Sequence, residues 1–227
     1  MRVLAIDCAL DACSAAVLDS ETGTIVASES RMMQRGHAEA VMPLIARVMD
    51  RSELGFGAID RIAVTVGPGS FTGLRVGIAA ARGIALAAGK PAVGLSTLAG
   101  LAAPHIADSA TAPVAAAIDA RHDCVYLQVF GPDGRTVVAP RLAPIEEAVR
   151  AAIAGPARIV GSAAERLAQA WPADEPPPLL VDQRRAPDIA WIARLGAAAA
   201  EGEGPPKPLY LRAPDARPQD ASRLLRR

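Results

Sequence analysis

A short motif that occurs twice constrains the fold of this 227-residue chain more than any other feature. The tripeptide Ala-Ile-Asp at residues 5–7 recurs at residues 117–119. After each copy the chain passes through a polar turn into an apolar run, a Gly-containing hairpin, a further strand and a helix, the second helix over roughly residues 145–154. These similarities indicate an internal duplication. Two unrelated antiparallel meanders can also share them, so both interpretations stay open at this point.

The order of predicted elements supports the duplication. The first half reads βββαβαβα, with three strands, an amphipathic helix, a strand, a Gly-rich turn, a long helix, a strand and a last helix (residues 3–7, 13–19, 24–28, 37–49, 61–66, 67–73, 74–88, 92–95 and from 96 or 97). A duplicated βββαβα unit is the architecture of the actin, Hsp70 and sugar-kinase (ASKHA) superfamily. We therefore predict an α/β fold with two lobes that face each other across a cleft. With 51% hydrophobic residues, the chain can bury a substantial core.

Proline and glycine positions suggest where the lobes end. Pro104 and the following His interrupt an apolar pattern, which predicts a first lobe over residues 1–103 and a smaller second lobe over residues 104–187. A helix and segment over residues 188–212 is expected to return to the first lobe. Residues 213–227 are expected to form a flexible tail, because five Arg and two Asp follow from residue 212 on.

Charge and composition argue against several functions. The 24 basic side chains balance 24 acidic ones, and aromatic residues make up 3% of the chain. Such a chain has no overall field for a phosphate backbone or an anionic membrane, and few rings to stack on bases. Any contact with RNA is therefore expected to be local or to be supplied by a partner. The chain has no signal-peptide pattern and no stretch of about 18 uninterrupted apolar residues, which predicts a cytoplasmic protein without a membrane contact.

The cysteines do not form a recognisable framework. Cys8, Cys13 and Cys124 are an odd number and contain no CxxC pair, which argues against disulfides and against a thiolate zinc site. We expect all three to be reduced packing residues.

A Gly-rich loop precedes the longest predicted helix. The sequence GPGSFTG follows a strand, so its backbone N–H groups lie where helices bind oxyanions. It lacks the Gly-Lys-Ser/Thr ending of a P-loop, and its glycines do not fit the dinucleotide fingerprint. A phosphate site and a plain tight turn with a Ser or Thr helix cap both stay open, and we favour the turn. The loop candidates are Gly67, Gly69, Ser70, Thr72 and Gly73.

The helix after the loop carries a stripe of small residues. Gly73, Gly77, Ala81 and Ala85 recur every fourth position. Glycine inside a helix costs about 1 kcal/mol relative to alanine, so a neighbour is expected to approach this face closely. That neighbour is either another element of this chain or a second protein.

Six segments between residue 3 and about residue 219 carry a family likeness: LAIDCALDACSAAVLD, HAEAVMPLI, GPGSFTGLRVGIAAARGIAL, GLSTLAGLA, AAIDARHDCVYLQVF and PLYLRAPDARPQ. In this order and spacing they resemble the TsaB (YeaZ) family over nearly the whole chain. Members of this family are similar to shortened forms of TsaD, the subunit that transfers a threonylcarbamoyl group to an adenosine of tRNA.

The resemblance implies that the chain is not itself an enzyme. TsaD binds its catalytic metal through two histidines one helical turn apart, and Thr97 and Leu101 stand at the corresponding positions here. His37, His105 and His122 are the only histidines, and no two are four residues apart. We expect no catalytic residue, no metal and no cofactor, while a nucleotide at a partner interface stays open.

The nucleotide hairpins also differ from those of superfamily kinases. Those enzymes keep glycine-rich phosphate turns, whereas the turns here read CALDACS and ARHDC. Asp7 and Asp119 stand at strand ends where kinases hold catalytic or magnesium-linked carboxylates. We favour a role for both in turn hydrogen bonds.

The function implied by the resemblance is that of a scaffold. The chain would bind TsaD, with TsaE joining, for threonylcarbamoyladenosine (t6A) modification of tRNAs that read codons starting with A, and it would form a homodimer when alone. Partner-binding candidates, chosen by helical periodicity, are Val41, Leu44, Ile45, Val48, Leu74, Gly77 and Ala81. The alternative is an independent small-molecule kinase or an M22-type peptidase of the same superfamily. The chain shows no Ser-His-Asp arrangement in a recognisable context and no His-Glu-x-x-His.

Overall fold

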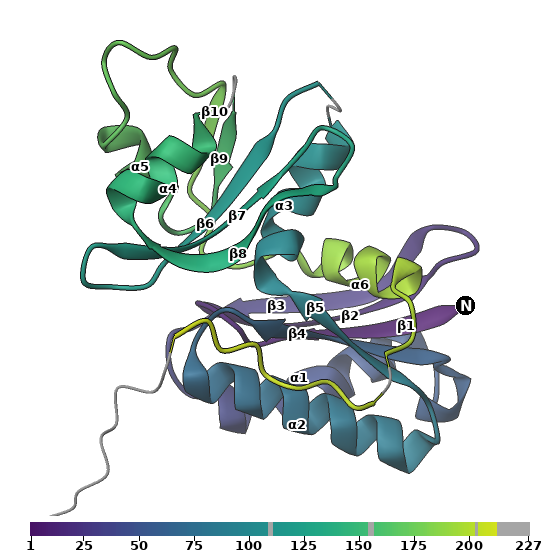
Figure 1. Cartoon of the computed structure of the whole chain (residues 1–227). Coiled ribbons are helices and arrows are strands. Elements are labelled where there is room, and N and C mark those ends of the chain that lie inside the picture. Colours follow the sequence, from purple (N-terminus) through teal and green to yellow (C-terminus); the bar gives the residue numbers. More distant parts are fainter. Residues whose placement is uncertain (109–110, 154–156, 203, 213–227) are drawn as a thin grey trace, which may run out of the picture.

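The chain folds into two lobes, each with a five-stranded sheet and its own helices (Figure 1). The computed structural model describes residues 1–108, 111–153, 157–202 and 204–212. The predicted flexible tail over residues 213–227 lies outside this described part.

The first lobe begins with a three-stranded meander and continues with alternating helices and strands. Its elements are β1 (Arg2–Asp7), β2 (Ala12–Asp19), β3 (Thr24–Met32), α1 (His37–Ser52), a 3-10 turn (Phe56–Ala58), β4 (Arg61–Gly67), α2 (Phe71–Ala88), β5 (Ala92–Ser96) and α3 (Thr97–Asp108).

The second lobe repeats this order with shorter elements. They are β6 (Val114–Asp119), β7 (Cys124–Phe130), β8 (Thr136–Pro144), α4 (Ile145–Ala152), β9 (Arg158–Val160), α5 (Ala164–Gln169), β10 (Leu180–Asp182) and α6 (Ile189–Ala198).

The two sheets have the same topology. The strand order is β3-β2-β1-β4-β5 in the first sheet and β8-β7-β6-β9-β10 in the second. In each, the first strand pairs antiparallel with the second and parallel with the fourth. Because strand order, strand direction and helix positions all repeat, the predicted duplicated βββαβα fold is confirmed.

Two helices cross between the lobes, and each covers the sheet of the other half. Helix α6 packs on β1, β2 and β4 through Ile189, Ile192 and Ala193, while α1 and α2 cover the opposite face of that sheet (Figure 1). Helix α3 packs on β6, β7 and β9 through Leu98, Leu101 and Ala102. The first sheet is therefore covered on both faces, which explains why β1 and β2 are buried along almost their whole length.

The predicted interruption at Pro104 does not occur. Helix α3 continues through Pro104 to Asp108, and His105 is a buried helical residue whose Nε2 lies 3.0 Å from Asp182 Oδ2. Burial lowers the pKa of His105, with Asp182 opposing that shift. The division of the chain into residues 1–103, 104–187 and 188–212 stays a prediction.

In the described part, α2 is the one helix whose length and hydropathy would suit a membrane span. Its Gly73, Leu74, Gly77, Ile78 and Ala81 face the first sheet. This placement is typical of a core helix of a globular protein.

Candidate functional site

The GPGSFTG loop connects β4 to α2 and ends in a helix cap. Ser70 Oγ accepts a hydrogen bond from the Gly73 N–H at 3.3 Å, so Ser70 is the cap and the exposed Thr72 is not. The Ser70 N–H donates to the Ala9 carbonyl oxygen in the β1–β2 turn at 2.7 Å. Gly67 has a φ of 121°, which only glycine adopts readily. The loop is thus fixed at its α2 end by hydrogen bonds within the chain.

The β1–β2 turn lies directly on this loop. A side chain at Gly69 would collide with the Ala9 carbonyl oxygen, and one at Gly73 would collide with the Cys8 carbonyl oxygen. Carbonyl oxygens therefore stand at the start of α2, where an oxyanion would need N–H donors. This arrangement favours the turn interpretation over a phosphate site.

The same contacts identify the neighbour of the small-residue stripe. At Gly77 an added Cβ would lie 3.4 Å from Cys8 Cβ, and Ala81 is completely buried. The close approach that the glycines indicated is made by the β1–β2 turn of this chain. A second protein is not needed to explain the stripe.

The seven predicted partner-binding residues lie in the interior of the first lobe. Their side chains are at most 3% exposed, and all belong to the buried faces of α1 and α2 (Val41, Leu44, Ile45, Val48, Leu74, Gly77 and Ala81). Apolar periodicity finds the face of a helix that is buried, and here that face is buried against the chain's own sheet. The seven are core residues of this chain, and their role in a partner contact stays a prediction.

A subset of the exposed residues of the same two helices defines a separate surface. This outer α1–α2 face consists of Ala38, Met42, Pro43, Ala46, Ala79, Arg82, Gly83 and Leu86. Its two large apolar side chains are Leu86, 85% exposed, and Met42, 49% exposed. Neither was selected from the sequence, because both lie off the periodic apolar stripe.

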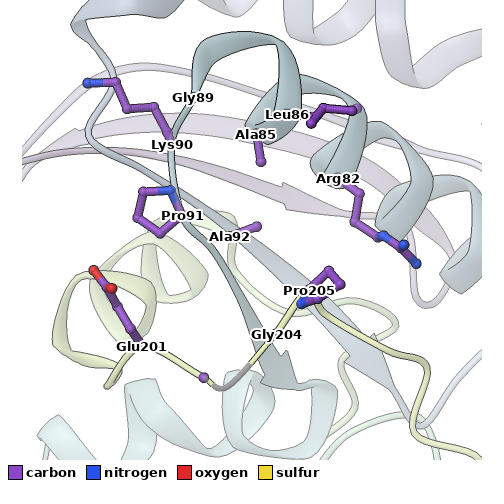
Figure 2. Close-up of a pocket in the computed structure, with 12 residues that line it drawn as sticks. Arg82, Ala85, Leu86, Gly89, Lys90, Pro91, Ala92, Glu201, Gly204 and Pro205 are labelled. Atoms are coloured by element: carbon purple, nitrogen blue, oxygen red, sulfur yellow. The ribbon is translucent and has the colours of Figure 1, made fainter.

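A hollow of about 670 Å³ opens beside Leu86 at the end of α2 (Figure 2). The side chains of Arg82 and Lys90 lie along it, and Glu201 faces them from the segment after α6. Glu201 also approaches Arg61 at 3.4 Å, so its charge is shared. The hollow extends the outer α1–α2 face toward the C-terminal segment.

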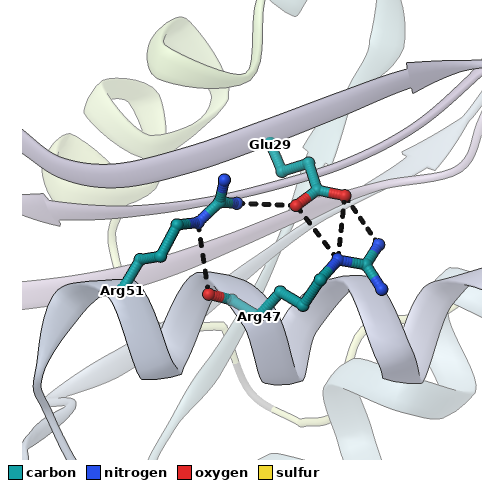
Figure 3. A network of polar contacts seen from close by, with 3 residues as sticks. All are labelled: Glu29, Arg47 and Arg51. Carbon is teal, nitrogen blue, oxygen red and sulfur yellow. Dashed lines mark hydrogen bonds and ion pairs between the residues drawn. The ribbon is translucent and has the colours of Figure 1, made fainter.

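An ion network fixes α1 against the edge strand β3 (Figure 3). Arg47 Nη2 lies 2.6 Å from Glu29 Oε1, and Arg51 Nη2 lies 2.7 Å from Glu29 Oε2. The hydrogen bond from Arg47, together with the charge of Arg51, holds the pKa of Glu29 below its usual range.

The C-terminal segment crosses the GPGSFTG loop and joins both lobes (Figure 1). Tyr210 stacks on Phe71 with ring centroids 5.6 Å apart, and Arg75 Nε donates to the Tyr210 hydroxyl at 3.0 Å. Arg212 Nη1 donates to the Ala120 carbonyl oxygen in the second lobe at 3.0 Å. The PLYLR sequence therefore holds the C-terminal segment against both lobes, a role that its composition did not indicate.

The cleft between the lobes is lined by paired charges. Its volume is about 420 Å³, and its walls include Asp119, Arg121, Glu165, Arg166 and Arg185. Arg166 binds Asp119 at 3.0 Å and also reaches Asp123 at 2.8 Å, while Arg185 approaches Asp11 at 3.9 Å. Much of the positive charge that a nucleotide would require is thus engaged by carboxylates.

Asp7 and Asp119 make equivalent turn hydrogen bonds. Asp7 Oδ1 accepts from the Ala9 N–H at 3.1 Å, and Asp119 Oδ1 accepts from the Arg121 N–H at 2.8 Å. The predicted turn role of both residues is confirmed.

The two aspartates differ in burial. Asp7 is inaccessible to solvent, and its Oδ1 also accepts from Thr65 Oγ1 at 2.5 Å, whereas its Oδ2 has no hydrogen-bond partner. Burial raises the pKa of Asp7 to about 6, although hydrogen bonds from Thr65 and Ala9 and the nearby His37 oppose the shift. This buried carboxyl group therefore changes charge near neutral pH.

The described residues contain no group of three or more His, Cys, Asp and Glu side chains that could hold a metal. Thr97 and Leu101, at the positions of the TsaD histidines, are both buried in α3. His37 is buried, with its Nε2 3.2 Å from the Leu10 carbonyl oxygen.

Comparison with known proteins agrees with this architecture. A family model described as TsaD, tRNA N6-adenosine threonylcarbamoyltransferase, matches residues 23–182. YeaZ from Pseudomonas aeruginosa superposes with a TM-score of 0.79 at 29% identity, covering 92% of this chain and 99% of that protein. An uncharacterized protein of Mycobacterium tuberculosis is 33% identical over 219 residues, which is 95% of this chain and 94% of the relative.

A curated relative carries a functional name. The tRNA threonylcarbamoyladenosine biosynthesis protein TsaB of Escherichia coli is 39% identical over 126 residues, which is 56% of this chain and 53% of the relative. The match thus spans about half the length of that relative. The fold and these matches define a two-lobed protein of the actin, Hsp70 and sugar-kinase class. Within this class the chain belongs to the TsaB (YeaZ) family.

Proposed function

We propose that this chain is a non-catalytic subunit for the formation of threonylcarbamoyladenosine on tRNAs that read codons starting with A. Its partners are a TsaD-type transferase and TsaE, and tRNA reaches it only through that assembly. Membership of the TsaB family is the observation that carries the proposal. In this reading the chain acts in the cytoplasm and has no cofactor of its own.

The outer α1–α2 face is our candidate for the partner contact. Leu86 is 85% exposed and Met42 is 49% exposed on neighbouring helices, and small residues between them let another helix approach closely. Large apolar side chains at the centre of an interface commonly provide most of its binding energy. The same face would form a homodimer when TsaD is absent, so the free chain has to exchange one partner for the other.

Two further features support a role without catalysis. The start of α2 faces carbonyl oxygens of the β1–β2 turn, and Arg166 and Arg185 of the interlobe cleft contact carboxylates. Both features weaken the alternative of an independent kinase. Heat released on titration of ATP into the isolated chain would favour that alternative.

The direct test is in-vitro t6A formation on unmodified tRNA with TsaC, TsaD and TsaE from the same organism. We expect product only when this chain is added, and none from this chain alone. Undiminished product without the chain would contradict the proposal.

A variant pair tests the surface. Leu86→Arg places a charge on the outer α1–α2 face and is expected to weaken TsaD binding at least about tenfold, which corresponds to about 1.4 kcal/mol. Val137→Arg is the matched control, because Val137 is 61% exposed on β8 of the other lobe. Equal affinity of both variants and the unmodified chain would exclude this face as the contact.

A further inference from the structure

Cys8 and Cys13 lie opposite each other at the end of the β1–β2 hairpin. The last register pair of these antiparallel strands is Asp7 with Ser14, so Cys8 and Cys13 are the next pair toward the turn. Directly opposed residues have Cα atoms about 4.5–5.5 Å apart, which is within the range that a disulfide spans. The two Sγ atoms are 3.6 Å apart. A bond of about 2.05 Å requires them to approach by roughly 1.5 Å, without a change of strand register.

The environment makes the two thiols unequal. The hydrogen bond from the Cys8 thiol, assisted by the charges of Arg31 and Arg47, lowers the pKa of Cys13, although burial and Asp7 oppose this shift. The same hydrogen bond, together with burial, raises the pKa of Cys8. The opposite directions of the two shifts make Cys13 the thiol of the pair that loses its proton more readily, and the thiolate is the nucleophilic form of cysteine.

Cys124 provides an internal comparison. It lies at the start of β7 in the second lobe and is partly exposed, whereas Cys8 and Cys13 are both buried in the first lobe. Exposure alone would make Cys124 the most reactive thiol. The geometry makes Cys8 and Cys13 the pair that can close a ring.

We propose that Cys8 and Cys13 form an oxidation site, in which hydrogen peroxide converts the opposed thiols into an intrachain disulfide. The Cys13 thiolate attacks one peroxide oxygen, the O–O bond breaks, and the leaving hydroxide takes up a proton to become water. The resulting Cys13 sulfenic acid is attacked by Cys8 sulfur, which loses its proton as the S–S bond forms and a second water leaves. The two sulfurs lose two electrons in total, and the peroxide gains them.

Access to the buried pair requires only local opening. Cys8 and Cys13 are 1% and 0% exposed, so oxidation requires the β1–β2 turn, whose Leu10 and Asp11 are partly exposed, to open locally and release the hydrogen bond from Ser70 to Ala9. Because Cys8 lies against Gly77, oxidation of Cys8 would alter the packing under α2, whose outer side is our candidate for the partner contact. This effect on a partner contact rests on the proposed function, whereas the oxidation of the two cysteines does not.

Thiol counting on the folded chain tests the site without any partner. The chain is treated with hydrogen peroxide, quenched, unfolded, alkylated and analysed by mass spectrometry. We expect the loss of two of the three alkylatable thiols, a peptide crosslink between Cys8 and Cys13, and the return of both thiols after dithiothreitol.

Matched variants distinguish disulfide formation between Cys8 and Cys13 from nonspecific oxidation of the thiols. Cys124→Ala is expected to lose both of its remaining thiols at the same rate as the unmodified chain. Cys8→Ala is expected to form no intrachain disulfide, and its Cys13 is expected to proceed to sulfinic acid. Three alkylatable thiols after treatment of the folded chain, or a Cys8–Cys13 crosslink that forms only after unfolding, would overturn the proposal.

Discussion

Replacement of Asp7 by asparagine is expected to stabilise the protein, and to do so only where the carboxyl group is charged. Burial raises its pKa from 3.8 to about 6. One pH unit of such a change corresponds to about 1.4 kcal/mol, so the buried charge costs about 3 kcal/mol of folding free energy when it is fully ionised. Asp7 is completely buried, so solvent screening does not reduce this cost.

The direction of this pH dependence of stability follows from proton linkage. The pKa of Asp7 in the folded state lies above its value in the unfolded chain, so the folded state holds the proton more tightly. The stability that this proton contributes is fully present below about pH 3.8, and it is lost as the pH rises through about 6. The Asp7→Asn variant keeps an oxygen that can accept from Thr65 and Ala9, but it carries no charge at any pH.

Urea denaturation of both proteins between pH 4 and pH 8 measures the effect. We expect the free energy of unfolding of Asp7→Asn to exceed that of the unmodified chain by about 3 kcal/mol at pH 8, and the difference to become small at pH 4. Asp119→Asn, in the exposed equivalent turn, is the control and should not reproduce the pH-dependent gain. Parallel curves for Asp7→Asn and the unmodified chain would refute the reasoning.

Two further substitutions probe the packing of α2 and α6. Gly73→Ala places a methyl group against the Cys8 carbonyl oxygen and should lower the free energy of unfolding by about 1–3 kcal/mol. Gly83→Ala adds a methyl group that has nothing within 4 Å, so the better helix propensity of alanine should raise the melting temperature by about 2–4 °C. If Gly83→Ala also destabilised the protein, helix propensity and the contact with Cys8 would not explain the effects of these two substitutions on stability. Arg61→Met removes donors to the Gly196 and Ala199 carbonyl oxygens at 3.0 and 2.6 Å. It should cost about 1–3 kcal/mol and speed amide exchange in α6, while Arg194→Met on the exposed side of that helix should do neither.

The fold could be predicted from the sequence because its main signals are local and occur twice. The Ala-Ile-Asp motif ends β1 and β6, and the same sequence of strands and helices follows each copy. Such agreement between local pattern and overall topology is a strong constraint on architecture. Pro104 does not interrupt α3, because a helix packed on both lobes can continue through a proline.

The candidate site was harder to predict, because apolar periodicity reports burial and not the identity of what buries a residue. Val41 and Leu74 satisfy the pattern and lie in the core, whereas Leu86 lies off the pattern and is exposed. The cysteine pair could have been found from the hairpin, since Cys8 and Cys13 stand at equal distances from the middle of the turn. Their separation of 3.6 Å, however, depends on packing that spacing does not specify.

The exchange of α3 and α6 between the lobes has a consequence for how the chain can be divided. A fragment that ends at Asp108 would leave Val3, Ala5 and Ala63 without the helix that covers them, and would carry Leu98 and Leu101 with no sheet to contact. The fragment that begins after Asp108 would carry α6 without the first sheet, and its own sheet would lack α3. Neither half is a self-sufficient folding unit, so the lobes are expected to unfold in one cooperative transition. Two fragments cut between α3 and β6 should regain structure only when mixed, each supplying the helix that the other lacks.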